Sequence, residues 1–420
     1  MERLHISGGN VLEGDISISG SKNACLPVLA ASLLSSERIS IFNLPDLVDV
    51  STMLKLIGKL AGECYEQDGS ALSIKAEEIQ CKKAPYDLVR TMRASFLVLG
   101  PLLARCGYAE VSLPGGCAIG SRPVDQHLKG FEAMGAHIEV RDGYVIAKTT
   151  EGLQGADIYF DNPTVGGTEN IMMAASLASG TTNILNASAE PEVKNLGDFL
   201  NAMGADVSGH GSNQIKVKGV SSLRGCTHRV AADRIEAGTF MVAAVATRGQ
   251  ITMNGVDPRE LEVVTELLSE FGAEIEKSSD RIRVSMEARP VAVDIETAPF
   301  PGFPTDLQAQ FMVLNAVARG KAFVREQIFE NRFMHVQELI RMGAKIELRG
   351  SNMAVVTGRK ALKGAPVMAT DLRASSSLVI GGLVAVGETI IDRIYHIDRG
   401  YEAIEKKLSA LGATVRRIGN

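Results

Sequence analysis

An internal repeat of about 70 residues is the feature that most constrains how this chain can fold. A tripeptide of the type Met-Gly-Ala closes a stretch that is apolar at helical spacing, and an alternating segment typical of a strand follows it each time. This order predicts that the glycine ends a helix and that the chain then enters a strand. An imperfect first copy lies at Ala61-Gly62, and the later copies are centred on Gly135, Gly204, Gly272, Gly343 and Gly412.

A second landmark recurs in step with the first. It consists of an apolar helical stretch, a glycine and a short β-branched strand, as in ASLASGTTNIL and AVARGKAFV, and only its first copy, LLSSERISIF, lacks the glycine. Two landmarks with one spacing indicate six units, each with two helices and three or four strands, which is too large for a solenoid repeat. The glycines of this second landmark are Gly107, Gly180, Gly249, Gly320 and Gly387.

The pattern of the helices indicates where they lie. The helices that start near residues 24, 93, 168, 237, 307 and 373 are apolar nearly all round, so we expect an α/β fold with these helices inside and the sheets outside. Single cores stop growing near roughly 250 to 300 residues, which favours two domains of three units each. The count gives one domain over residues 22–229 and a second over 1–21 and 230–420, with two chain crossings between them.

Composition excludes several classes of protein. Apolar residues make up 45% and charged residues 22%, as in globular proteins, and no apolar run approaches the length of a membrane span. The start, MERLHISGG, lacks the pattern of a secretory signal, so we expect a cytoplasmic protein. Forty-four basic residues against 49 acidic ones, without tryptophan, argue against a nucleic-acid partner. The cysteines show no C-x-x-C motif and predict neither disulfides nor a metal site.

Charged residues gather where the interior helices begin. A helix N-terminus favours anions, so a lysine or arginine there is opposed by the helix dipole unless an anion is bound. The pattern therefore suggests a site for a multiply charged ligand. The alternative is that these cations pair with Asp306 and Asp371 across a domain interface. The residues concerned are Lys22 and Asn23, Arg93, Gly166 to Thr168, Arg234 and Glu236, Thr305 and Asp306, and Asp371 with Arg373.

The segment 111–125, VSLPGGCAIGSRPVD, departs from its counterparts in the other units. Its density of glycine and proline predicts an exposed loop. Cys117 on this loop, five residues from Arg122, has the setting of a reactive thiol, whereas Cys25 and Cys106 lie in apolar helices. Two further patches, FENRFMH and HIDRGYE, could be functional or merely solvated loops.

Several motifs taken together resemble one family, the bacterial UDP-N-acetylglucosamine 1-carboxyvinyltransferases, which are enolpyruvyl transferases. The similarity runs along the whole chain, and the P-G-G-C loop is its most specific part. The motifs are GSKNA (20–24), YDLVRTMRAS (86–95), LPGGCAIGSRPVDQH (113–127), DRIEAGT (233–239), FPTDLQAQ (303–310), FENRFMHV (329–336), ATDLRAS (369–375) and IDRGYE (397–402).

The resemblance implies two inside-out α/β domains of three units each. It also implies transfer of the enolpyruvyl group of phosphoenolpyruvate to the 3'-hydroxyl of UDP-N-acetylglucosamine, with release of phosphate, as the first committed step of peptidoglycan synthesis. No metal or organic cofactor is implied, and we expect a monomer or a weak oligomer.

Roles for individual residues follow from the same resemblance. Cys117 would protonate carbon 3 of phosphoenolpyruvate, form a covalent adduct and react with the epoxide fosfomycin. Asp306 would take the proton of the sugar hydroxyl, and Asp371 would line the site. Lys22, Arg122 and Arg399 would neutralise the anion. The implied substrate-binding residues are Lys22, Asn23, Arg93, Arg122, Pro123, Val124, Asp125, His127, Thr164, Val165, Gly166, Asp306, Ile328, Arg373 and Arg399.

Two other classes of protein remain as alternatives. The related 5-enolpyruvylshikimate-3-phosphate synthases share the repeat, but the Cys117 loop argues against that activity. A ring of six repeats without enzymatic activity, such as a DNA sliding clamp, would carry a basic inner surface rather than paired Asp and Arg at helix starts.

Overall fold

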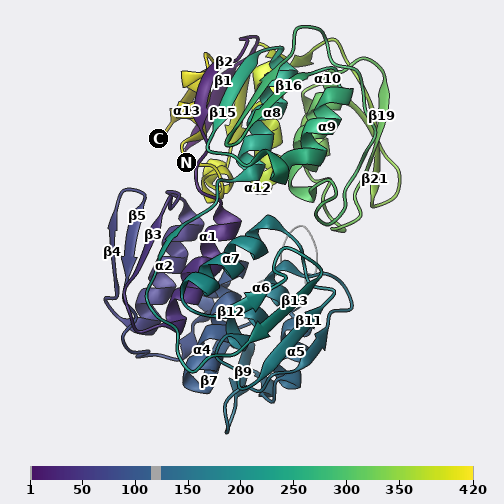
Figure 1. Ribbon diagram of the computed structural model, residues 1–420. Coiled ribbons are helices and arrows are strands. Elements are labelled where there is room, and N and C mark those ends of the chain that lie inside the picture. Colours follow the sequence, from purple (N-terminus) through teal and green to yellow (C-terminus); the bar gives the residue numbers. More distant parts are fainter. Residues whose placement is uncertain (1, 115–123, 420) are drawn as a thin grey trace. The chain divides into compact units, whose positions relative to one another are not determined.

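The computed structural model describes residues 2–114 and 124–419 of the 420-residue chain. It separates into two compact units, which are described one at a time (Figure 1). The terminal unit holds both chain ends, up to Ser19 and from Ala232 onward, and the inserted unit runs from Gly20 to Ala231. The chain therefore passes twice from one unit to the other.

The inserted unit contains three sheets of four strands. In the order of hydrogen bonding they are β14 (Thr227–Arg229), β3 (Ile39–Phe42), β5 (Ala71–Ile74) and β4 (Tyr65–Asp68); β6 (Lys83–Ala84), β7 (Tyr108–Ser112), β9 (Tyr144–Lys148) and β8 (His137–Arg141); and β10 (Asp157–Tyr159), β11 (Thr181–Leu185), β13 (Gln214–Lys218) and β12 (Asp206–Ser208).

The terminal unit also contains three sheets of four strands, and a two-stranded sheet of β22 (Leu362–Lys363) and β24 (Ala385–Val386). The four-stranded sheets are β23 (Pro366–Met368), β25 (Glu388–Asp392), β1 (Arg3–Ser7) and β26 (Thr414–Ile418); β2 (Glu13–Ser17), β15 (Gln250–Asn254), β17 (Arg281–Ser285) and β16 (Glu274–Ser278); and β18 (Ile295–Glu296), β19 (Lys321–Arg325), β21 (Met353–Thr357) and β20 (Lys345–Leu348).

All six four-stranded sheets have the same topology. One edge strand pairs in parallel with its neighbour, and the other two pairs are antiparallel. In the third sheet of the inserted unit, for example, Ile184 lies opposite Ile158 in the parallel pair and opposite Ile215 in the antiparallel pair. The six predicted repeats are therefore confirmed, each with four strands.

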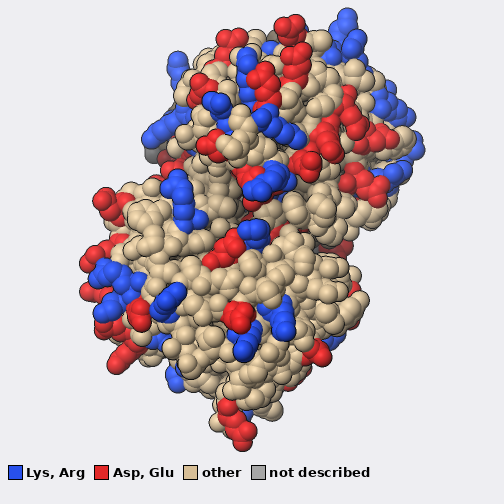
Figure 2. All heavy atoms as spheres, in the orientation of Figure 1, with Lys and Arg blue, Asp and Glu red and all other residues tan. Residues whose placement is uncertain are grey.

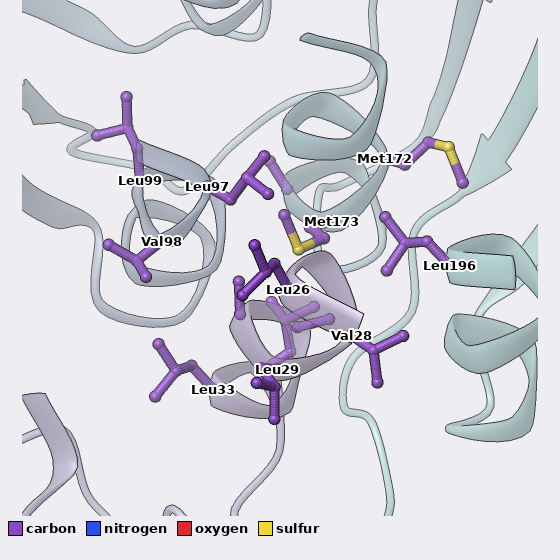
Figure 3. Packing of buried hydrophobic residues seen from close by; sticks show 14 of the residues in the cluster. Leu26, Val28, Leu29, Leu33, Leu97, Val98, Leu99, Met172, Met173 and Leu196 are labelled. Atoms are coloured by element: carbon purple, nitrogen blue, oxygen red, sulfur yellow. The ribbon is translucent and has the colours of Figure 1, made fainter. Parts of the chain in front are cut away.

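Interior helices fill the space enclosed by the sheets of each unit. All fourteen residues of α8 (Arg234–Thr247) are buried, which explains why its sequence has no polar face. Figure 3 shows how apolar side chains from α1 (Lys22–Ala31), from residues 97–99 and from α6 (Val165–Ala175) meet in the inserted unit. The predicted arrangement of helices inside and sheets outside is thus confirmed. The other interior helices are α4 (Leu99–Cys106), α10 (Gln308–Val317) and α12 (Leu372–Val384).

Six further helices of the described ranges have one buried and one exposed face. They are α2 (Val48–Ala61), α5 (Asp125–Ala133), α7 (Pro191–Ala202), α9 (Glu262–Glu270), α11 (Val336–Arg341) and α13 (Ile404–Ala410); the short helical segments are α3 (Tyr86–Val89), η1 (Ser32–Leu34), η2 (Arg93–Val98), η3 (Pro258–Leu261), η4 (Thr305–Leu307) and η5 (Ile394–Arg399), where η marks a 3₁₀-helix.

A short 3₁₀-helix precedes two of the interior helices, and only the one expected near residue 93 begins well away from its predicted start. The helices expected near residues 93 and 307 start as the 3₁₀-helices η2 and η4, and the α-helical turns follow at Leu99 and Gln308. Pro101 explains the first case, because it has no N–H to donate to the carbonyl of Leu97, and its ring excludes α-helical bonding there. Arg93 and Asp306 therefore lie on 3₁₀ turns and not at the start of an α-helix.

The repeat glycines have the left-handed backbone conformation that the pattern predicts, except in the fourth unit, where Arg248 adopts it in place of Gly249. Gly135, for example, has a φ of 87° after α5, in the left-handed region that glycine adopts without strain. In the fourth unit Arg248 takes that conformation instead, with a φ of 58°. Gly249 serves another purpose there, because a β-carbon would lie 2.1 Å from the carbonyl oxygen of Leu12.

Acidic and basic side chains alternate over the face of the molecule drawn in Figure 2. This mixture agrees with the near balance of the two charges in the sequence. Within residues 2–114 and 124–419, no helix combines the length and the apolar character needed to cross a bilayer.

Candidate functional site

Three of the predicted site residues, Cys117, Arg122 and Pro123, lie outside the described residues. The others belong to two groups, one in each unit.

In the inserted unit, the predicted anion-binding residue Lys22 lies at the start of α1. The Ser21 hydroxyl caps this helix by accepting a hydrogen bond from the Ala24 N–H (3.3 Å). The Lys22 ammonium lies 3.3 Å from a carboxylate oxygen of Asp49, on α2, and the Asp49 side chain is only 5% exposed. Lys22 therefore has a protein carboxylate within reach, and Asn23 beside it is half-buried.

A neutral polar cluster joins the helical segments η2, α4, α5 and α6 of the same unit, and we call it the Asn170 hub (Asn170, His127, Phe96 and Gly100). The Asn170 amide oxygen accepts from the Gly100 N–H (2.8 Å), so its nitrogen faces the Phe96 carbonyl (3.2 Å) and His127 Nδ1 (3.2 Å). Asn170 is fully buried. Its NH₂ group donates to His127 Nδ1, which places the imidazole proton on Nε2.

The electrostatics of this hub keep His127 uncharged. Burial, with a smaller contribution from Arg93, lowers the pKa of His127 to about 3. The ring also packs edge-on against Phe96, with 5.3 Å between ring centroids. At neutral pH His127 can therefore donate one hydrogen bond but cannot bind an anion as an imidazolium.

Part of the predicted nucleotide-binding set gathers around His127. A methyl group placed on Gly166 would lie 3.4 Å from the imidazole ring, so the start of α6 packs directly on it. The Thr164 hydroxyl caps α6 by accepting from the Gly167 N–H (3.3 Å). Of the remaining members, Val165 and Asp125 are exposed and Val124 is buried.

In the terminal unit, Asp306 lies between two buried arginines, and we call these three residues the Asp306 cluster. Arg332 Nη2 lies 2.6 Å from one carboxylate oxygen and Arg373 Nη2 lies 2.7 Å from the other. Both arginine side chains are 6% exposed, whereas that of Asp306 is 26% exposed. Each guanidinium group bonds one oxygen of the carboxylate, whose side chain stays partly exposed.

The charge of Arg373 is secured by this pairing. Burial is the largest single influence and opposes the charged form, but Asp306, Tyr401 and Asp233 together outweigh it and hold the pKa of Arg373 above its ordinary value. The ion pair that the sequence left as an alternative thus exists, and it lies within the terminal unit. A cation at a helix start is consequently no proof of an anion site.

Asp371 is the N-cap residue of α12. One of its carboxylate oxygens accepts from the backbone N–H groups of Arg373 (2.8 Å) and Ala374 (3.1 Å), as an N-cap does. It also lies near His335, where burial is the main cause that lowers the pKa to about 4. The structure assigns Asp371 a capping role, and its catalytic role stays a prediction.

The predicted contact residue Ile328 is held by a buried carboxylate that the sequence analysis missed. Glu326 is 2% exposed and accepts from the backbone N–H groups of Ile328 (2.8 Å) and Phe329 (3.1 Å). Its other oxygen accepts from the Thr305 hydroxyl (2.9 Å), next to Asp306. Glu326 thus connects the loop of Ile328 with the turn of Asp306.

Arg399 ends the 3₁₀-helix η5 and is half-buried. The preceding residue, Asp398, forms a two-pronged ion pair with Arg417 on β26, with distances of 2.6 and 3.0 Å. Arg417 also bonds Glu405 (3.1 and 3.2 Å). The segment that carries Arg399 is therefore tied to the last strand of the chain.

The sequence could have indicated some of the missed residues better than others. Arg332 lies in the motif FENRFMH, which the sequence analysis left open, but nothing local indicates that it faces Asp306. Asn170 lies in an apolar helix, where a buried amide is a recognisable signal. No group of three or more potential metal ligands occurs within residues 2–114 and 124–419.

Comparisons with known proteins agree on one family. The family model for EPSP synthase (3-phosphoshikimate 1-carboxyvinyltransferase) matches residues 6–408. The UDP-N-acetylglucosamine 1-carboxyvinyltransferase of Magnetococcus marinus is 57% identical over 420 residues, which is all of both chains.

Solved structures show the same fold. The enolpyruvyl transferase NikO from Streptomyces tendae superposes with a TM-score of 0.89 at 25% identity, over 99% of this chain and 98% of that one. An EPSP synthase from Acinetobacter baumannii gives a TM-score of 0.76 at 17% identity over the whole of both chains, a likeness of fold alone.

Proposed function

The chain belongs to the EPSP synthase family of 1-carboxyvinyl (enolpyruvyl) transferases, and on that premise we propose the reaction it performs. It transfers the enolpyruvyl group of phosphoenolpyruvate to the 3'-hydroxyl of UDP-N-acetylglucosamine and releases phosphate, as the first committed step of peptidoglycan synthesis. The observation that carries this choice of acceptor is the match to the Magnetococcus enzyme along the full length of both chains. We propose a cytoplasmic location and a monomer or weak oligomer.

The reaction needs one base and one acid. In the first step the sugar oxygen bonds to carbon 2 of phosphoenolpyruvate while a proton adds to carbon 3. In the second step the adduct loses a proton from carbon 3 and phosphate from carbon 2, which restores the double bond. Asp306 is suited to receive the proton of the sugar hydroxyl, because its carboxylate is ionised and partly exposed. Arg332 and Arg373 hold both of its oxygens in place.

Anion recognition falls to Lys22, Arg122 and Arg399 in this proposal. Lys22 lies beside Asp49, and an incoming phosphate or carboxylate would share the ammonium with that carboxylate. A flexible ammonium with three donors can serve both at once. Asp371, as the cap of α12, keeps the start of the helix that carries Arg373 in place.

Cys117 supplies the acid in this proposal, on the motif alone. Its position in a glycine-rich segment, five residues before Arg122 in the sequence, is the setting in which a cysteine is reactive. The two cysteines of the interior helices differ: burial raises the pKa of the Cys25 thiol far above its usual value, and it also raises that of Cys106. Selective reaction at Cys117 is the expected consequence.

A phosphate-release assay with phosphoenolpyruvate and either acceptor tests the proposal. We expect turnover with UDP-N-acetylglucosamine and none with shikimate 3-phosphate; the reverse would assign the chain to the other branch of the family. Cys117→Asp should retain turnover, because a carboxylic acid can deliver the proton, and Cys117→Ser should lose it. Fosfomycin should label Cys117 in the wild type, and a label on Cys25 or Cys106 instead would refute the assignment.

A further inference from the structure

Tyr401 is a buried side chain whose hydroxyl lies where the three interior helices of the terminal unit converge. It follows Arg399 by two residues and is 1% exposed. One polar side chain from each helix lies within hydrogen-bond distance of the hydroxyl: Thr239 of α8 at 2.9 Å, Gln310 of α10 at 3.4 Å and Arg373 of α12 at 3.4 Å. We call these four residues the Tyr401 network.

The direction of the hydrogen bonds in this network is determined by its ends. The Thr239 hydroxyl donates to the Ile235 carbonyl (2.7 Å), so its oxygen can only accept from Tyr401. The proton of the Tyr401 hydroxyl therefore points to Thr239. Its lone pairs then face Arg373 Nη1, which can only donate to them. The Gln310 amide nitrogen also lies 3.4 Å from the Tyr401 oxygen, but the Thr239 oxygen is a nearer acceptor for it at 3.1 Å.

This arrangement fixes the plane of the Arg373 guanidinium. Nη1 bonds the Tyr401 hydroxyl and Nη2 bonds Asp306, so two nitrogens of a rigid planar group have separate partners. The guanidinium carbon also lies 5.8 Å from the centre of the Tyr401 ring. Gln310 connects the network to Asp306 as well, because its amide nitrogen donates to the backbone carbonyl of Asp306 (3.0 Å).

The segment that carries Arg399 is bounded by two residues in a disfavoured conformation. Arg393 has a φ of 61° and Ala403 a φ of 43°, and neither is glycine. A left-handed residue of this kind is disfavoured by contact of its β-carbon with the following carbonyl, so the surrounding contacts must hold it. Tyr401, between Arg399 and Ala403, is buried in this stretch together with Ile394 and Ile397.

We propose that Tyr401 is a positioning residue for the transfer reaction: its hydroxyl orients the Arg373 guanidinium against Asp306 and couples that ion pair to the segment of Arg399. This inference rests on the proposed function. The hydroxyl touches neither substrate nor reacting atoms in this role and acts only through Arg373. Its removal should therefore change the rate of the chemical step more than the binding of the sugar nucleotide.

Four variants separate this role from simple packing. Tyr401→Phe removes the hydroxyl and keeps the ring beside Arg373, and Thr239→Val removes the acceptor of the Tyr401 proton. Thr239→Ser restores that acceptor. Thr247→Val is the matched control, because Thr247 is a buried threonine of the same helix that donates to the Ala243 carbonyl (2.8 Å) as Thr239 donates to Ile235.

We expect Tyr401→Phe and Thr239→Val each to lower kcat by about tenfold to a hundredfold, the range for a hydrogen bond to a charged group. KM for UDP-N-acetylglucosamine should stay within about twofold, and the double variant should be no worse than the stronger single one, because both break one chain of bonds. Thr239→Ser and Thr247→Val should keep wild-type kcat. The assay is phosphate release at saturating substrates, with circular dichroism to verify folding.

The outcomes distinguish the two levels of inference. No turnover by the wild type with UDP-N-acetylglucosamine would refute the proposed function itself. Wild-type turnover with an unchanged kcat in Tyr401→Phe would refute the positioning role alone, and so would an equal loss in Thr247→Val or an effect confined to KM. If Tyr401→Phe does not fold, Thr239→Val and Thr239→Ser test the same hydrogen bond, because Thr239 accepts the proton of the Tyr401 hydroxyl.

Discussion

The two units have one architecture but solve the burial of polar groups in opposite ways. In the inserted unit the Asn170 hub is neutral: an amide and an uncharged imidazole satisfy backbone groups of η2 and α4. In the terminal unit the Asp306 cluster is ionic, with one carboxylate between two buried guanidiniums. A neutral hub stabilises and holds its shape at little electrostatic cost, whereas an ionic cluster is useful where charge must develop during a reaction.

The difference also shows in the apolar surroundings. Figure 3 shows leucine, valine and methionine side chains from α1, η1, α6 and α7 and from residues 97–99 in the interior of the inserted unit. The terminal unit also has a large cluster of buried apolar residues, and its three central helices meet at the hydroxyl of Tyr401. The repeat therefore fixes the frame, and the residues at the helix starts decide which polar groups meet in the interior of each unit.

The largest expected effect is on activity and comes from neutralising the ionic cluster. Asp306→Asn keeps the shape of the side chain but removes the base and leaves Arg332 and Arg373 facing each other without a carboxylate. We expect kcat/KM to fall about a thousandfold, within the range for loss of a general base. Phosphate release measures this.

A matched control for Asp306→Asn is Asp294→Asn. Asp294 is an exposed carboxylate of the same unit that accepts from the Phe323 N–H (2.7 Å), and its variant should retain activity within about twofold. Activity of Asp306→Asn within tenfold of the wild type would show that the ionic cluster is structural, and the contrast between the two units would lose its functional meaning.

The next effect is on stability and concerns the neutral hub. Asn170→Ala leaves the Gly100 N–H and the Phe96 carbonyl buried without this partner, which should reduce the free energy of unfolding by about 3 kcal/mol. Urea titration of the whole chain measures it. Asn183→Ala, which removes an amide bonded to Asp157 at the surface, should change stability by less than about 0.5 kcal/mol. Equal losses in the two variants would contradict the importance of the hub.

The smallest effect is a pH dependence of the neutral hub. The pKa of His127 lies near 3 in the folded chain, below its ordinary value of 6.5, so only the unfolded chain takes up this proton in mild acid. The contribution of the neutral His127 to the free energy of unfolding is therefore complete above pH 6.5. It declines as the pH falls and is about 2 kcal/mol smaller at pH 5. His127→Gln keeps an acceptor near Asn170 but cannot titrate there.

Urea titrations of the wild type and His127→Gln at pH 7 and pH 5 give the test. The wild type should lose about 2 kcal/mol more than the variant between these two values. Parallel losses would mean that the folded chain binds the proton as readily as the unfolded one, and the hub could then not be called neutral.

Local sequence patterns were sufficient to predict the arrangement of helices and sheets in this protein. The spacing of the repeat glycines, the apolar helices and the alternating strands together predicted six units, interior helices and outer sheets, and these were all found. Such features are readable because each depends on residues close together in the chain. The family resemblance, drawn from short motifs, is confirmed by identity along the whole chain. The role of Cys117 stays a prediction, since it lies outside the described residues.

The partners of the charged residues were decided only by the tertiary structure. Asp306 pairs with Arg332 and with Arg373, which are 26 and 67 residues away, and Tyr401 bonds Thr239 across 162 residues. The sequence showed cations and carboxylates at helix starts but left open which would meet. That choice depends on how three helices from three repeats converge in one interior, and the energy of a buried ion pair depends on contacts of this kind and not on any local pattern.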